Sequence, residues 1–148
     1  MRVLLDTNVI VDVLQRREPW FADGQQIFYA VANKQIIGCI TAKEAADIHF
    51  FSRKQFTGEE NVDAKARQVL TKLYAIFELI DTLGIDCQNA IAVENKDYED
   101  AIMMVSGVRA GVDCIVTRNP YHFTQSPVPV YSPADFVKKL SEEPCPES

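Results

Sequence analysis

The sequence predicts an α/β protein of three layers, with helices on both faces of a mostly parallel central sheet. Short apolar runs of strand length alternate along the chain with longer segments whose apolar residues recur at helical spacing. The run at residues 36–40 is apolar throughout, which is typical of a parallel strand buried on both faces. A chain of 148 residues is long enough for one core, so we expect a single domain over residues 1–140.

The first forty residues predict a strand, two helices and a second strand. Residues 2–5 form a short apolar strand, and the apolar side chains of residues 9–14 then follow helical spacing. Residues 16–19, which include a proline, end that helix. Residues 20–33 are expected to form the second helix, before the strand at residues 36–40.

Two helices joined by a polar loop are expected next. Thr41 fits the N-cap of a helix over residues 42–54, because Glu44 stands three residues later, as in a capping box. A loop at residues 57–62 leads to an amphipathic helix over residues 63–76.

The middle of the chain predicts a strand at residues 77–80, a turn around Gly84 and a short helix over residues 87–94. A longer helix over residues 97–110 follows, and Gly111 stands where a C-terminal glycine is expected.

The last part of the chain predicts a strand at residues 113–117 and a loop at residues 118–126. Prolines flank residues 128–131, which suits an edge strand. A final helix begins at Ser132 and Pro133 and runs through residue 140, and residues 141–148 form a loose tail.

The composition narrows the classes of function. A formal net charge of −6 counts against tight, nonspecific binding of nucleic acid, but it does not exclude an enzyme whose bound cations face a phosphate. No apolar stretch is long enough to span a bilayer and no signal-like segment opens the chain, so we expect a cytoplasmic protein with no membrane partner. The four cysteines lack the paired spacing of a zinc site and are expected to be reduced and structural; they are Cys39, Cys87, Cys114 and Cys145.

Acidic residues recur where predicted strands end or helices begin. Asp6 ends the first strand, Glu44 lies in the first turn after the second, and Asp97 and Asp100 share one face at the start of a late helix. The carboxyl ends of parallel strands meet at one edge of a sheet, so these acids are expected to converge there. Converging carboxylates favour a hard divalent cation such as Mg²⁺ or Mn²⁺. Helix capping and the helix dipole explain each acid separately, and that alternative stays open.

This combination resembles the PIN-domain family of metal-dependent ribonucleases. The matching segments are residues 4–10, 41–44, 97–101 and 115–119, and their order covers the chain from residue 2 to about residue 140. The resemblance implies a PIN-like fold and hydrolysis of single-stranded or structured RNA, which leaves a 5′-phosphate and a 3′-hydroxyl. It further implies that Asp6, Glu44 and Asp100 are catalytic and hold Mg²⁺ or Mn²⁺, with Asp97 as a neighbouring ligand or a supporting acid.

The resemblance also assigns supporting residues. Those expected to orient water and the ligands are Thr7, Asn8, Thr117 and Asn119. Candidates for contacting the RNA backbone are Lys43, Arg53, Lys54 and Arg118, although a solvated helix face explains the first three equally well. Trp20 and Tyr121 are candidates for stacking on bases, with a core or partner-interface role as the alternative for Trp20.

The chain departs from the family pattern at the fourth acidic position. Many relatives place an aspartate in the segment that here contains Asn119 and His122. An amide oxygen coordinates without adding negative charge, so the number of metal ions, one or two, stays open. His122 is either a ligand, a proton shuttle or a surface hydrogen-bonding group.

Many members of the family are the toxin half of bacterial toxin–antitoxin pairs, which implies a small antitoxin that inserts a basic or apolar segment. The resemblance also admits a homodimer. Aromatic residues expected at such an interface, or in the core, are Trp20, Phe21, Phe50, Phe51 and Phe56. The main alternative is a catalytically weak domain that serves as a docking module for protein or RNA. A haloacid-dehalogenase type of phosphohydrolase would want an aspartate at Asn8, and we set it aside.

Overall fold

The computed structural model describes residues 1–94 and 97–143, within which five strands form one all-parallel sheet. The strand order is β3-β2-β1-β4-β5, and the strands are β1 (Arg2–Leu5), β2 (Ile37–Thr41), β3 (Glu78–Ile80), β4 (Cys114–Val116) and β5 (Val130–Tyr131). The helices are α1 (Thr7–Leu14), α2 (Phe21–Ala32), α3 (Ala42–Gln55), α4 (Val62–Ile76), α5 (Gly84–Ala90), α6 (Tyr98–Arg109) and α7 (Pro133–Glu142), with a 3₁₀ turn η1 (Pro120–Phe123).

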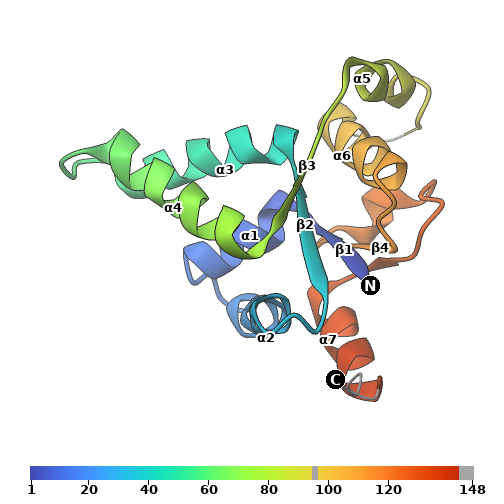
Figure 1. Ribbon diagram of the computed structural model, residues 1–148, viewed down its shortest axis with the longest axis horizontal. Helices are drawn as coiled ribbons and strands as arrows, with labels where there is room; N and C mark the ends of the chain where they lie inside the picture. The colour runs from blue at the N-terminus through green and yellow to red at the C-terminus, as the bar shows by residue number, and fades with distance from the viewer. Residues whose placement is uncertain (95–96, 144–148) are drawn as a thin grey trace.

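Alternate residues of the central strand enter two different cores, which makes the fold three-layered. Val3 and Leu5 are fully buried in a core that includes Ile27 of α2 and Phe136 of α7. Leu4, between them, packs in a second core with Met103 of α6 and other residues. Helices therefore cover both faces of the sheet, and α2 and α7 lie on the side opposite α6 (Figure 1). The predicted three-layer α/β fold is confirmed.

Helices α3 and α4 lie side by side and extend away from the sheet as an arm (Figure 1). Ile48 and Leu73 anchor this α3–α4 arm in the core. The predicted capping box begins α3: the Glu44 amide donates to Thr41 Oγ1 at 3.3 Å, and the Thr41 amide donates to Glu44 Oε1 at 3.0 Å. The capping box thereby fixes Glu44, one of the candidate site residues, in the first turn of α3.

Several predicted boundaries differ from the structure. The predicted short helix is present, but its predicted bounds of 87–94 are wrong, because α5 spans Gly84–Ala90. Asp86 starts it earlier by accepting a hydrogen bond from the Leu83 amide at 2.8 Å, and the Arg109 guanidinium of α6 holds the same carboxylate at 2.8 Å. The predicted loop at 118–126 contains η1, and α7 continues two residues into the predicted tail. Residues 144–148 of that tail lie outside the described residues.

The order in which strands are added to the sheet reverses next to β1. The chain runs from β1 to β2 and β3 on one side, and β4 and β5 fill the other side, so the switch lies between β1 and β4. Ligands of open α/β sheets bind at the carboxyl ends of the strands at such a point. The Asp6 amide extends the pairing beyond β1 by donating to the Val116 carbonyl at 2.9 Å. Asp6 and Thr117 thus flank the switch point.

Cys39, Cys87 and Cys114 are free thiols, as predicted, and Cys145 lies outside the described residues. Burial raises the pKa of Cys39 to about 11 and that of Cys114 to about 12, so both stay protonated at neutral pH. Across residues 1–94 and 97–143, no helix is long and apolar enough to cross a membrane.

Gly38 of β2 tests how tightly the sheet packs on its helices. A Cβ added there would lie 2.7 Å from the Phe77 ring and 2.7 Å from Val31 Cγ2. We expect Gly38→Ala to lower the free energy of unfolding by about 1–3 kcal/mol, measured by urea denaturation, because a rigid ring blocks the added methyl group. Gly84→Ala is the control, since no described atom lies within 4 Å of its added Cβ. Equal stability of the two variants would contradict this packing.

Candidate active site

Asp6 lies directly after β1, buried at the edge of the sheet. Its side chain is only 7% exposed. Oδ2 accepts a hydrogen bond from Thr117 Oγ1 at 2.8 Å and another from Asn8 Nδ2 at 3.3 Å. Asn8 in turn accepts one at its Oδ1 from the Arg118 amide at 3.3 Å, so residues behind β1 and β4 are linked across the switch point.

Glu44 enters the same region from the start of α3. Its side chain is 1% exposed, and Oε1 accepts hydrogen bonds from both the amide and the hydroxyl of Thr41, each at 3.0 Å. The second oxygen, Oε2, lies 3.5 Å from Thr7 Oγ1, a long contact. One carboxylate oxygen of Glu44 therefore caps the helix, and the other faces the residues that follow β1.

Asp97 and Asp100 come from the start of α6. Asp97 is the N-cap, and its Oδ1 accepts a hydrogen bond from the Glu99 amide at 2.9 Å. Asp100 lies one turn inward, with its Oδ2 at 3.3 Å from Nδ1 of His122 in η1. The structure thus accounts for Asp97 as a cap, whereas Asp100 is placed at the site by contact with a distant part of the chain.

The carboxylates raise one another's pKa values. Burial, then the charge of Asp100, raises the pKa of Asp6 to about 6, against the hydrogen bond from Thr117. Burial, then Asp6, raises the pKa of Glu44 well above its ordinary value. Burial, then Asp97, raises the pKa of Asp100, and Lys43 acts in the opposite direction on all three acids. Ionising these groups together is unfavourable unless positive charge is added.

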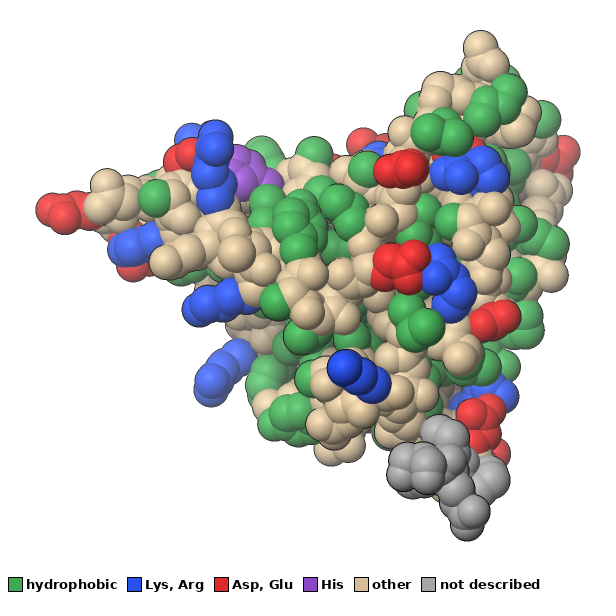
Figure 2. Space-filling model, in the orientation of Figure 1, with side chains coloured by type: hydrophobic (Ala, Val, Ile, Leu, Met, Phe, Trp, Pro, Cys, Tyr) green, Lys and Arg blue, Asp and Glu red, His purple; other side chains and the backbone are tan. Residues whose placement is uncertain are grey.

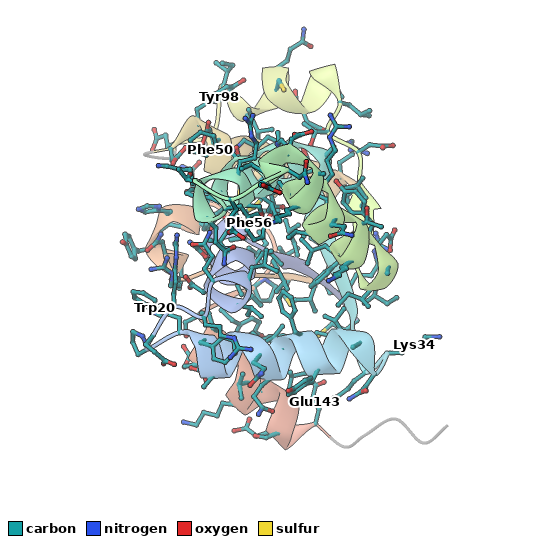
Figure 3. The ribbon with its side chains drawn as sticks, turned by 90° about the vertical axis from the view of Figure 1, so that its left-hand side faces the viewer. Trp20, Lys34, Phe50, Phe56, Tyr98 and Glu143 are labelled. Atoms are coloured by element: carbon teal, nitrogen blue, oxygen red, sulfur yellow. The ribbon has the colours of Figure 1, made fainter. Side chains whose placement is uncertain are left out.

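A cavity of about 450 Å³ opens at this edge. Acidic side chains on its wall include Asp6, Asp47, Asp97, Glu99 and Asp100. The other lining residues include Thr7, Asn8, Asn119 and His122, the basic Arg17, Lys43 and Arg118, and the aromatic Phe50 and Phe51. Phe50 and Tyr98 lie at the upper end of the same side of the molecule as Trp20 (Figure 3). The lining of the cavity thus combines acidic side chains with two phenylalanines.

The carboxylates of this cavity are the type of ligand that a hard divalent cation prefers, but they are not arranged around one point as metal ligands. Within the described part of the chain, no three Asp, Glu, His or Cys side chains form a ready metal-binding group. Two observations favour a cation nevertheless: the donors are carboxylate oxygens, and Asp6 and Asp100 repel each other across the cavity.

The four basic candidates fall into two groups. Lys43 and Arg118 line the cavity, but both are paired: Lys43 with Asp47 and Glu99, and Arg118 with Asp12. Arg53 and Lys54 line a separate hollow near the end of α3, with Phe50. Figure 2 shows basic and acidic side chains interspersed on the face it presents, without one continuous basic patch.

Asp12 contacts Arg118 of this cavity and, like the lining residues Arg17, Asp47 and Glu99, was not among the candidates from the sequence. It is 1% exposed, and its Oδ2 lies 2.8 Å from Arg118 Nε. Among the described residues neither Asp12 oxygen accepts a well-aligned hydrogen bond, so the contact acts through charge. The Arg118 guanidinium also stacks on Trp20, 3.9 Å from the ring centre. An aspartate within the apolar stretch of residues 9–14 was the available signal.

The sequence model of one family, described as the PIN domain, matches residues 2–120. The chain belongs to the PIN-domain family. No curated protein matches its sequence.

Solved structures of PIN-domain proteins share the fold. VapBC2 from Rickettsia felis, bound to a DNA fragment from its promoter, is 14% identical with a TM-score of 0.58, over 89% of this chain and 98% of that one. FitAcB from Neisseria gonorrhoeae is 16% identical with a TM-score of 0.58, over 89% and 98%. DNA-bound VapBC from Salmonella typhimurium is 16% identical with a TM-score of 0.63, over 90% and 98%. At these identities the likeness concerns the PIN fold alone.

The raised pKa of Asp6 predicts how metal-free stability varies with pH. The Asp6 carboxyl keeps its proton up to about pH 6 in the folded protein, whereas in the unfolded chain its pKa is 3.8. Its contribution to the free energy of unfolding is therefore most favourable below pH 3.8 and is lost as the pH rises from there through 6. The shift corresponds to a loss of about 3 kcal/mol. We expect Asp6→Asn to remove this loss in urea denaturation with EDTA at several pH values.

The exposed Asp135 at the start of α7 provides the matched control, Asp135→Asn. Parallel pH profiles for wild type and Asp6→Asn would show that the acid is not buried as described.

We expect the main role of Arg118 to be structural, through its contact with the buried Asp12. We expect Arg118→Ala to lower the free energy of unfolding by about 3–5 kcal/mol, because the buried Asp12 charge loses its close partner. Arg17→Ala is the control: Arg17 Nη1 lies 4.0 Å from Asp12 Oδ1, and its removal should cost about 1 kcal/mol or less. Similar effects of both substitutions in urea denaturation would contradict the assignment.

Proposed function

We propose that this PIN domain is an endoribonuclease that depends on Mg²⁺ or Mn²⁺, and that it is the toxin component of a toxin–antitoxin pair. The observation that carries the proposal is the meeting of Asp6 and Asp100, which are 94 residues apart in the sequence, on the wall of one cavity near the buried Glu44. Membership of the PIN family supports a nuclease, and the fold shared with VapBC and FitAcB supports a toxin.

In this proposal Asp6, Glu44 and Asp100 hold the cation, and Asp97 supports them from the start of α6. When bound, such an ion activates water and stabilises the charge that develops on the phosphate. Thr117 and Asn8 hold the Asp6 carboxylate in place through its Oδ2. The Thr7 hydroxyl is placed to donate to Glu44 Oε2. The backbone amide of Asn119 donates to Thr117 Oγ1 at 3.1 Å, which orients that hydroxyl.

The RNA would lie along the cavity. Lys43 is the basic group best placed for a phosphate, since it lines the cavity and lies within electrostatic reach of Asp6 and Asp100. Arg53 and Lys54 would contact RNA only beyond the cavity, along the α3–α4 arm. Tyr121 is 65% exposed at the same edge and is available to stack on a base.

An antitoxin segment is the second partner proposed. Phe50 is 57% exposed and lies on the cavity wall next to the acids, so a segment that carries both apolar and basic side chains would match it. The alternative of a docking module with weak or no activity is favoured by one observation, the absence of an acid at Asn119 and His122. A homodimer stays a prediction from the family resemblance.

The test is cleavage of labelled single-stranded RNA with Mn²⁺ or Mg²⁺. We expect cutting that EDTA abolishes, and a loss of about a hundredfold or more in Asp6→Asn and in Asp100→Asn, because each variant removes a charged ligand. Asp135→Asn, far from the cavity lining, should cut like the wild type.

Two outcomes would contradict the proposal. Equal activity in all four proteins would indicate a contaminating nuclease. Absence of cutting by a folded wild type, on several RNAs and with both metals, would favour the docking module.

A further inference from the structure

His122 lines the cavity and has no role in the proposed function. It lies on η1, which follows β4, and its Nδ1 is 3.3 Å from Asp100 Oδ2. Both side chains are largely buried, 22% and 19% exposed. The neighbouring Tyr121 ring meets the imidazole edge to face, with 4.5 Å between ring centres. The imidazole is thus held in the acidic cavity.

The spacing of these two atoms suits neighbouring ligands of one ion. In an octahedral site with bonds of about 2.1 Å, adjacent ligand atoms lie about 3.0 Å apart. Nδ1 and Oδ2, 3.3 Å apart, are close to that separation without rearrangement of the backbone. A cation placed between them would replace the contact that the two side chains now make with each other.

The other candidate on this segment is less suited. The Asn119 amide oxygen already accepts a hydrogen bond from the Tyr121 hydroxyl at 3.2 Å, and the Asn119 backbone amide donates to Thr117. His122, in contrast, has its described polar contact with a carboxylate that the proposed function assigns to the cation. Of the two residues in this segment, the imidazole is the better donor.

We propose that His122 supplies a nitrogen ligand to the divalent ion at this site, beside Asp100, and that the site therefore selects Mn²⁺ over Mg²⁺. Imidazole binds transition metals well, whereas Mg²⁺ prefers an all-oxygen set. The inference rests on the proposed function, because it needs a cation at the carboxylates. In this site, the neutral imidazole of His122 would take the place of the negatively charged fourth acid.

The test is electron spin echo envelope modulation of the Mn²⁺-bound, tag-free protein, which detects nitrogen nuclei coordinated to Mn²⁺ without reference to activity. The chain has two histidines, so labelling with ¹⁵N-histidine identifies the donor type and two variants identify the residue. His49 pairs with Asp63 on the α3–α4 arm, with 3.0 Å between Nε2 and Oδ1, and does not line the acidic cavity. His49→Gln is therefore the matched control.

We expect histidine nitrogen coupling in the wild type and in His49→Gln, and none in His122→Gln. Calorimetric titration should show Mn²⁺ affinity lower by about tenfold or more in His122→Gln. In His122→Asp, which restores an oxygen ligand, the ratio of Mn²⁺ to Mg²⁺ affinity should fall by about tenfold or more.

Three results would overturn the inference. Mn²⁺ bound without histidine coupling would leave the proposed function standing and make His122 only a hydrogen-bonding neighbour of Asp100. Coupling that persists in His122→Gln would assign the nitrogen to another residue. Failure of Mn²⁺ to bind at millimolar concentration would remove both this inference and the metal dependence proposed above.

Discussion

The cavity depends on carboxylates that are withdrawn from water within electrostatic reach of one another. Burial raises the pKa of Asp6 and of Glu44, and mutual repulsion adds to the effect. A protein gains no stability from such an arrangement by itself. It persists because the rest of the fold holds the groups there. Asp6 directly follows β1, which lies between β2 and β4, and Glu44 is held by the capping box at the start of α3.

The supports are distributed over segments far apart in the sequence. The direction switch between β1 and β4 brings the Thr117 hydroxyl to Asp6, and the buried Asp12 ties α1 to Arg118, the next residue along. On the other side, Arg109 binds Asp86, so α5 is fastened to the helix whose first turn carries Asp100. Glu44 and Asp100 thus lie in the first turns of helices, and Asp6 and Asp97 lie directly before helices.

Much of this was predictable because it follows local rules. Apolar periodicity predicted every strand of the sheet, and the Thr41–Glu44 register predicted the cap of α3. The start of α5 was not predicted: the Leu83 amide donates to Asp86 there, and the same carboxylate is held by Arg109, twenty-three residues away, a contact that the sequence does not reveal. For the same reason the sequence suggested Arg118 as a free RNA contact, whereas the fold pairs it with Asp12 and Trp20. The convergence of Asp6 and Asp100 was inferred from strand ends, but which side chain faces Asp100 required the structure.

The two carboxylate oxygens of Glu44 have different contacts, which limits how variants at this position can be interpreted. One of its oxygens closes the first turn of α3, while the other lies 3.5 Å from the Thr7 hydroxyl, so the proposed metal ligand is also a structural group. An inactive Glu44 variant would therefore be ambiguous, since lost cleavage and a frayed arm have a common origin. Asp100, whose carboxylate caps nothing in the described fold, separates the two effects. Under the proposed function, a substitution at position 44 would therefore remove a helix cap and a metal ligand together.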